Sequence, residues 1–155
     1  MNEPRMLSFE ISLHPRPSSS RTASAHADRL GDWPTLSIPR QDAAVPFGVA
    51  GDDCLAAISR LDRAFVEPDG SFVWRREDGG RGWQVDGTIH ERNGRVLLAE
   101  LKGDCPEPEF DRLLAAFGWP GQAMAMQLLR EGIWLEEETF RRRAAAAFRE
   151  ASGRG

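Results

Sequence analysis

Alternating apolar and polar residues mark the first regular segment of the chain. From Leu7 to Leu13 the two classes alternate strictly, which is the period of a strand with one buried face. From His14 to about Pro46 the composition changes to Pro, Ser, Ala and Arg, with few apolar anchors. We therefore expect residues 1–46 to form an N-terminal strand and an irregular arm, and residues 47–155 to form a single α+β domain.

Helical spacing of apolar residues begins near Gly51. The apolar positions recur every three or four residues from Cys54 to Phe65. Asp52 or Asp53 is placed to cap this helix. Two further helices are expected, one at about 107–117 with the apolar stripe Phe110, Leu113, Leu114 and Phe117, and one from Glu136 to about Ala151.

Strand patterns lie between these helices, at about 71–76, 83–92 and 95–102. The last two are separated by Asn93-Gly94, the dipeptide typical of a tight hairpin. The stretch 123–135 is apolar enough for one strand, or for two short strands with a break near residues 130–132. The order helix, three-stranded antiparallel meander, helix, strand, helix indicates an α+β fold.

The register of the 83–102 hairpin decides which polar side chains meet. A two-residue loop sets Asp86 opposite Leu101, whereas a three-residue loop with a bulge sets Asp86 opposite Glu100. We favour the second register because it separates apolar from polar side chains, and burial of one face is what fixes register. Its buried face would hold Val85, Ile89, Leu97, Ala99 and Leu101, packed against the 107–117 helix.

The polar face of this hairpin holds the residues with recognisable site chemistry. Asp86 and Glu100 would be cross-strand neighbours, and two adjacent carboxylates repel unless a proton or a cation lies between them. A magnesium or manganese ion would bridge them while keeping water ligands. Lys102 is the only lysine among 20 basic residues, and its ammonium would orient an ion-bound water and offset charge on a phosphate.

The order of these residues, Asp86 followed by Glu100-Leu101-Lys102, resembles the PD-(D/E)XK nuclease superfamily over about residues 51–135. The resemblance implies a restriction-endonuclease-like core. It also implies that Asp86, Glu100 and the Leu101 carbonyl bind Mg or Mn and that Asp86, Glu100 and Lys102 are catalytic. The function implied is metal-dependent phosphodiester hydrolysis, with an inactive relative of such an enzyme as an alternative.

The sequence departs from the pattern of that superfamily in two ways. Val85 stands where proline is common, and the first helix has no obvious acid for a third metal ligand, Asp62 and Glu67 being the candidates. A plainer interpretation also stays open, in which Glu100 and Lys102 form a solvated ion pair that contributes little to stability.

Charge and length also indicate a function of a different class. With 24 acidic and 20 basic residues the chain has no overall basic footprint, so DNA or RNA binding would depend on the local cluster Arg75, Arg76 and Arg81. Length, acidity and element order resemble the class I type III secretion chaperones. That resemblance implies an adaptor that binds partner peptides, a homodimer, and an N-terminal arm that contacts another protein.

The remaining chemistry-bearing residues are given lesser roles. Cys54 and Cys105 are too few for a disulfide framework, and their places near helix starts favour lowered thiol pKa values. His14, His26 and His90 are expected to be exposed. No apolar run is long enough to span a membrane, so we expect a cytoplasmic protein without a membrane partner.

Overall fold

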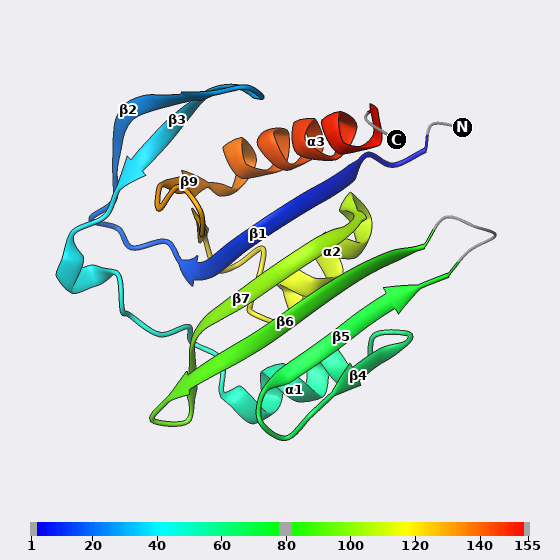
Figure 1. Ribbon diagram of the computed structural model, residues 1–155. Helices are drawn as coiled ribbons and strands as arrows, with labels where there is room; N and C mark the ends of the chain where they lie inside the picture. Colours follow the sequence, from blue (N-terminus) through cyan, green and yellow to red (C-terminus); the bar gives the residue numbers. More distant parts are fainter. Residues whose placement is uncertain (1–2, 78–81, 154–155) are drawn as a thin grey trace.

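A single antiparallel sheet organises the molecule (Figure 1). The computed structural model describes residues 3–77 and 82–153. In this part of the chain nine strands follow the spatial order β2-β3-β9-β8-β1-β7-β6-β5-β4. The strands are β1 (Met6–Pro15), β2 (Arg21–Asp28), β3 (Gly31–Ser37), β4 (Ala64–Val66), β5 (Ser71–Arg76), β6 (Trp83–Arg92), β7 (Arg95–Pro106), β8 (Met124–Leu128) and β9 (Trp134–Glu136), and the helices are α1 (Gly51–Ser59), α2 (Glu107–Ala115) and α3 (Glu137–Gly153).

The helices cover one face of the sheet and leave the other open. In Figure 1 α1 and α2 lie behind the strands, and α3 runs along β1 below the β2–β3 hairpin. The ring of Phe9 on β1 lies 5.2 Å from Phe110 on α2 and 6.0 Å from Phe140 on α3, so both helices pack on the same side of β1. The apolar side chains of the strands therefore form the core, and their polar side chains form an open face.

The nine-stranded sheet corrects the predicted fold class. A three-stranded meander in a restriction-endonuclease-like core was expected, with β1 as a separate strand and an irregular arm after it. Instead β1 lies near the middle of the sheet, paired with β7 and β8, and residues 21–37 of the expected arm form the β2–β3 hairpin. The arm prediction was wrong because β2 is exposed along most of its length, so it lacks the apolar alternation that indicates a strand.

Several individual elements agree with their sequence patterns. β5 and β6 match the predicted strands, and α2 buries Phe110, Leu113 and Leu114 as predicted. Phe117 is also buried, but it lies in the turn after α2, which ends at Ala115. The stretch 123–135 forms two strands, β8 and β9, rather than one. β7 continues to Pro106, beyond the predicted end at Lys102, because β1 pairs with its last residues.

The first helix is shorter than predicted. α1 ends at Ser59, and Phe65 lies in β4 with 60% of its surface exposed. Arg63 adopts a positive φ of 63°, which turns the chain out of the helical path. Ala50 occupies the N-cap, and no side chain caps the helix, so the predicted cap by Asp52 or Asp53 was wrong.

Neither of the two registers considered for the β6–β7 hairpin is the observed one. Asn93 and Gly94 form a two-residue turn with φ values of 54° and 79°. Further from the turn along the paired strands, a bulge shifts the register between His90 and Glu91. The shift sets Asp86 opposite Lys102. The bulge shifts the pairing by one residue from the two-residue-loop register. The sequence pattern did not indicate this combination of a two-residue turn and a bulge.

The faces of the hairpin nevertheless agree with the favoured prediction, except beside the bulge. The observed register differs from the favoured one by two residues, and side chains alternate with a period of two, so the faces are unchanged. Val85, Ile89, Ala99 and Leu101 are buried as predicted. Beyond the bulge Val96 is buried and Leu97 is half-buried, which reverses the prediction for Leu97.

Gly87 is required by packing across β5 and β6. It lies opposite Phe72, and a Cβ atom at this position would be 2.2 Å from a carbon of the Phe72 ring. The glycine therefore makes room for an aromatic side chain in the core, directly beside Asp86.

Candidate functional site

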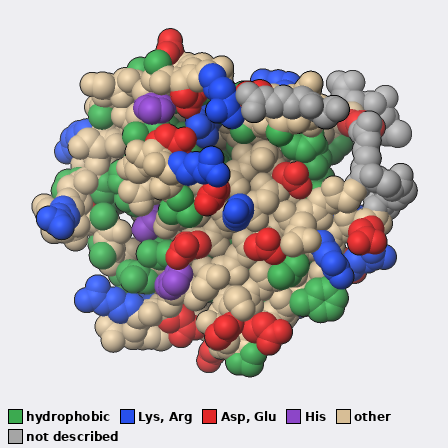
Figure 2. Space-filling model, viewed as in Figure 1, with side chains coloured by type: hydrophobic (Ala, Val, Ile, Leu, Met, Phe, Trp, Pro, Cys, Tyr) green, Lys and Arg blue, Asp and Glu red, His purple; other side chains and the backbone are tan. Residues whose placement is uncertain are grey.

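The open face of the sheet contains a shallow depression of about 350 Å³. Asp86, Glu100 and Lys102 all line it, so the structure brings together the three predicted site residues. Glu10 of β1, which pairs with Lys102, adds a carboxylate that the sequence pattern did not single out. Figure 2 shows acidic and basic side chains interspersed with uncharged ones over this face.

The two predicted metal ligands have other partners within the depression. Asp86 pairs with Lys102 and Glu100 with Thr88, so the carboxylates are not directly opposite each other as predicted. Glu100 Oε1 lies 2.8 Å from His90 Nε2, and Asp86 Oδ1 accepts a hydrogen bond of 3.0 Å from the side-chain Nε2 of Gln84. The pairing differs because the two-residue turn and the bulge together shift β7 by two residues relative to the favoured register.

A third metal ligand is not found where it was expected. Asp62 and Glu67 do not line the depression. Within residues 3–77 and 82–153, no group of three or more His, Cys, Asp or Glu side chains is arranged to hold a metal ion. Binding of Mg or Mn by Asp86, Glu100 and the Leu101 carbonyl stays a prediction.

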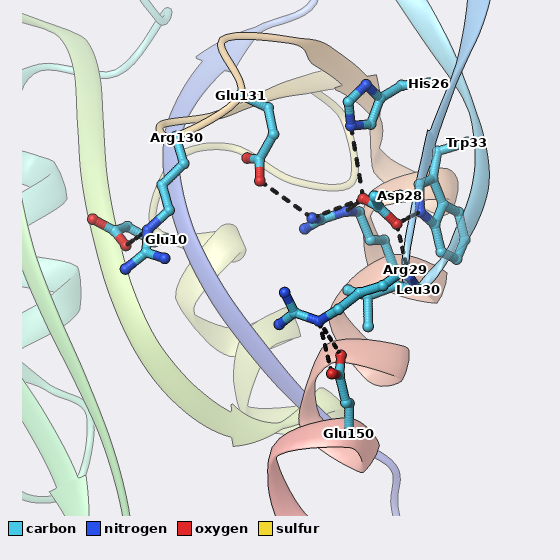
Figure 3. Close-up of polar contacts among 10 residues, drawn as sticks. Glu10, His26, Asp28, Arg29, Leu30, Trp33, Arg130, Glu131 and Glu150 are labelled. Carbon is cyan, nitrogen blue, oxygen red and sulfur yellow. Dashed lines mark hydrogen bonds and ion pairs between the residues drawn. The ribbon is translucent and has the colours of Figure 1, made fainter.

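A larger groove of about 580 Å³ lies beside the N-terminal half of β1, and we call it the β1-edge groove. One wall is Ser8–Glu10 of β1, and the opposite wall is the β2–β3 hairpin tip, residues 28–30 (Figure 3). The end of β8 and the turn after it close one end, and α3 contributes Phe140, Arg143, Ala144 and Ala147. Residues 102–104 of β7 complete the lining.

Within the described residues, no strand pairs with β1 on its β8 side along the Met6–Phe9 part of this groove. β7 pairs with β1 from Met6 to Leu13, whereas β8 pairs only from Ile11 to Pro15. The Leu129 amide donates to the Glu10 carbonyl at 3.3 Å, so the even-numbered residues of β1 direct their backbone groups to the β8 side.

The β8–β9 turn is what ends the pairing. The Gly132 amide donates to the Leu128 carbonyl at 2.8 Å, and the chain turns away from β1 into β9. In the described part of the chain, no strand therefore pairs with the Ser8 N–H and C=O on this side. An unpaired strand edge is a template for another strand.

The hairpin tip is fixed to the rest of the molecule by Asp28. Its Oδ1 accepts hydrogen bonds from the Leu30 amide at 2.9 Å and from Trp33 Nε1 at 3.0 Å, and its Oδ2 accepts from Arg143 Nε at 3.0 Å (Figure 3). Burial disfavours the charged carboxylate, but these donors outweigh that effect and hold the pKa of Asp28 below its usual value. The wall of the groove thus keeps its charge and its position.

Ion pairs also join the walls of the groove to its surroundings. Arg29 Nε donates to both carboxylate oxygens of Glu150 on α3, at 2.7 and 2.8 Å. Arg130 lies 3.6 Å from Glu10 on the opposite side (Figure 3). The sequence prediction missed Arg29 and Arg130 because Arg29 belongs to the expected arm and Arg130 to a turn. The local signal for this tip was the Asp28 turn followed by Gly31, a pattern that indicates a turn without locating it in space.

The three histidines differ in exposure, and the prediction for His14 was wrong. His14 is only 7% exposed, its Nε2 lies 2.6 Å from Ser12 Oγ, and its ring packs edge-on against Trp134 at 4.6 Å. Burial lowers the pKa of His14 to about 4. His26 is half-buried, and His90 is exposed as predicted.

The cysteines are buried thiols rather than activated ones. Cys54 and Cys105 have no exposed surface, and burial raises both thiol pKa values, that of Cys54 to about 12. Glu91 contributes a smaller electrostatic effect in the same direction at Cys54. The expected lowering by helix starts is absent because desolvation of the thiolate dominates.

The predicted arginine cluster is described only in part. Arg75 and Arg76 lie at the end of β5, and Arg81 lies outside the described residues. Among the helices of the described ranges, none is both long and apolar enough to cross a membrane. Comparison of the chain with protein-family models, curated proteins and solved structures finds no match in any of the three.

Proposed function

We propose that the protein is a binding module that takes up an extended segment of another protein as an added strand at the edge of β1. The observation that carries the proposal is the unpaired backbone of β1 facing the β1-edge groove. Strand addition uses main-chain hydrogen bonds for affinity and side-chain pockets for specificity, and it needs no catalytic residue.

The dimensions of the groove support this function. The edge of β1 from Met6 to Phe9, before the Glu10 carbonyl that Leu129 already binds, spans roughly 14 Å at about 3.4 Å per residue, enough for a segment of about four residues. The segment would run antiparallel to β1 and continue the line of β8. Its side chains would alternate between the α3 side, near Phe140 and Ala147, and the open face, near Glu10 and Lys102.

Substitution of Ser8 by proline tests the proposal by removing one backbone hydrogen-bond donor of β1. The variant Ser8→Pro removes the N–H that faces the groove, and β7 does not use this group, so the β1–β7 ladder is retained. The matched control is Ser8→Ala, which removes the hydroxyl and keeps the N–H. Thermal unfolding of both variants checks that each is folded.

The probe is an array of nine-residue peptides with valine at alternate positions and varied polar residues between them, acetylated and amidated at their ends. We expect peptides that bind the wild type and Ser8→Ala equally. They should bind Ser8→Pro about tenfold or more weakly, because one hydrogen bond is lost and the peptide carbonyl that accepted it is left unpaired. Hydrogen exchange should show the Ser8 amide protected on binding. Absence of binding, or equal binding by Ser8→Pro, contradicts the proposal.

Metal-dependent phosphodiester hydrolysis in the depression is a second candidate. Its support is that Asp86, Glu100 and Lys102 line one hollow that is not covered by a helix, beside the carboxylate of Glu10. Asp86 and Glu100 would bind Mg or Mn, and Lys102 would offset charge on the phosphate. This candidate does not depend on the superfamily fold that the sequence pattern suggested.

Cleavage assays test this second candidate. Wild type should cleave single- or double-stranded DNA or RNA with Mg or Mn, and Glu100→Gln or Lys102→Ala should abolish cleavage without unfolding the protein. Glu138→Gln is the matched control, because Glu138 is an exposed carboxylate on α3 outside the depression. Absence of cleavage by the wild type with either metal contradicts hydrolysis.

A further inference from the structure

The acidic groups around the β1-edge groove already have cationic partners. Arg29 holds Glu150 through two hydrogen bonds, and Arg130 lies beside Glu10. Arg143 lies 3.0 Å from Asp28 and 3.5 Å from Glu131. Asp104 is the remaining lining acid, and burial raises its pKa. Few acceptors in the groove are therefore left for a cationic ligand.

The basic groups, in contrast, retain free donors. Arg29 binds Glu150 through Nε alone, so within the described residues its two terminal nitrogens have no hydrogen-bond partner. Figure 3 shows these nitrogens pointing away from Glu150 into the space beside β1, with Arg130 on the opposite side. The side chains of Arg29 and Arg130 are 70% and 83% exposed, and Lys102 has no ion pair within the described residues.

We infer that the β1-edge groove selects an extended segment carrying an aspartate or glutamate side chain, which is held by Arg29 and Arg130 across the opening. The inference rests on the proposed function and names the class of segment bound. Arginine presents paired N–H donors that match the two oxygens of a carboxylate, and such charge-assisted bonds are about twice as strong as neutral ones.

A basic or amide side chain at the same position is disfavoured for separate reasons. A lysine would face Arg29 and Arg130 and find the neighbouring carboxylates already paired, so repulsion would add to the missing bonds. A glutamine offers one acceptor oxygen without charge. We therefore expect the groove to select a carboxylate side chain over the amide of nearly the same shape.

Matched peptides measure this selection directly. Each binding peptide from the array is compared with glutamate, glutamine or lysine at each polar position, and capped ends leave the side chain as the only carboxylate. At one position the wild type should bind the glutamate peptide about tenfold or more tightly than the glutamine peptide. The lysine peptide should bind more weakly still.

Four variants separate recognition of the carboxylate from support of the hairpin tip. Arg29→Gln and Arg130→Gln should each bring the glutamate-to-glutamine ratio close to one. Arg112→Gln, at a side chain on α2 that is 69% exposed and outside the groove, should leave the ratio unchanged. Glu150→Gln removes the ionic partner of Arg29 but keeps the guanidinium, so the ratio should be kept or increased.

The outcomes distinguish this inference from the function on which it rests. Peptides that bind in a Ser8→Pro-sensitive way, but with equal affinity for acid and amide, overturn the inference and leave the proposed function standing. A ratio that persists in Arg29→Gln and Arg130→Gln overturns it as well. Absence of any binding that depends on Ser8 refutes both.

Discussion

The two faces of the sheet are built from the same strands but are determined in different ways. On the covered face Leu101, Val85 and Phe9 pack under the helices, and any register that keeps the alternation buries the same side chains. On the open face the neighbours of each polar side chain depend on the exact pair partners, as Asp86 and Lys102 illustrate. The core therefore tolerates a two-residue error in register, whereas a candidate site does not.

The largest contrast between the faces should come from two adjacent residues of β7. Leu101 is 1% exposed in the core, and Lys102 points to the open face. Leu101→Ala should lower the free energy of unfolding by about 2–5 kcal/mol, because it leaves a cavity. Lys102→Ala should change it by about 0.5 kcal/mol or less. Urea unfolding of both variants measures the contrast, and similar losses would show that the faces are assigned wrongly.

His14 provides a second test of the comparison. It lies on the open face of β1, yet near the end of this strand its side chain is buried. The folded pKa of about 4 lies below the ordinary value of 6.5, so the unfolded chain binds the extra proton first as pH falls. The stability that depends on neutral, buried His14 is complete above pH 6.5. It is lost as pH falls towards 4, by up to about 1.4 kcal/mol per pH unit.

Urea unfolding at several pH values measures this loss. The wild type should lose more stability than His14→Gln between pH 6.5 and 4, since the variant lacks the titrating group. An NMR titration midpoint near 6.5 for His14 would show instead that the ring is exposed and that this end of the face is open.

The smallest expected difference lies at the bulge, where the alternation of faces is interrupted. Val96 is fully buried and Leu97 is half-buried, although the smaller side chain is usually the cheaper one to truncate. Val96→Ala should cost about 1.6 kcal/mol for two buried methyl groups, and Leu97→Ala less than about 1 kcal/mol. Thermal unfolding gives the ranking, and the reverse order would place the bulge elsewhere in β7.

Local patterns explain which elements were predictable. β5, β6 and α2 follow from apolar periodicity, and the turn at Asn93-Gly94 follows from residues that tolerate a positive φ. The residues of the candidate depression were also indicated, because Asp86, Glu100 and Lys102 share a face in any register of the correct parity. Their pairing was not, since a bulge leaves no clear mark in the pattern.

The chain by itself determined the type of most central elements and the face on which each strand buries its side chains, because these depend on neighbours two to four residues away. Tertiary structure alone decided that β1 lies inside the sheet, that the β2–β3 tip is anchored through Asp28, and that β8 ends before covering Ser8. Each of these depends on residues that are distant in sequence. The β1-edge groove lies beside the part of β1 with which β8 does not pair.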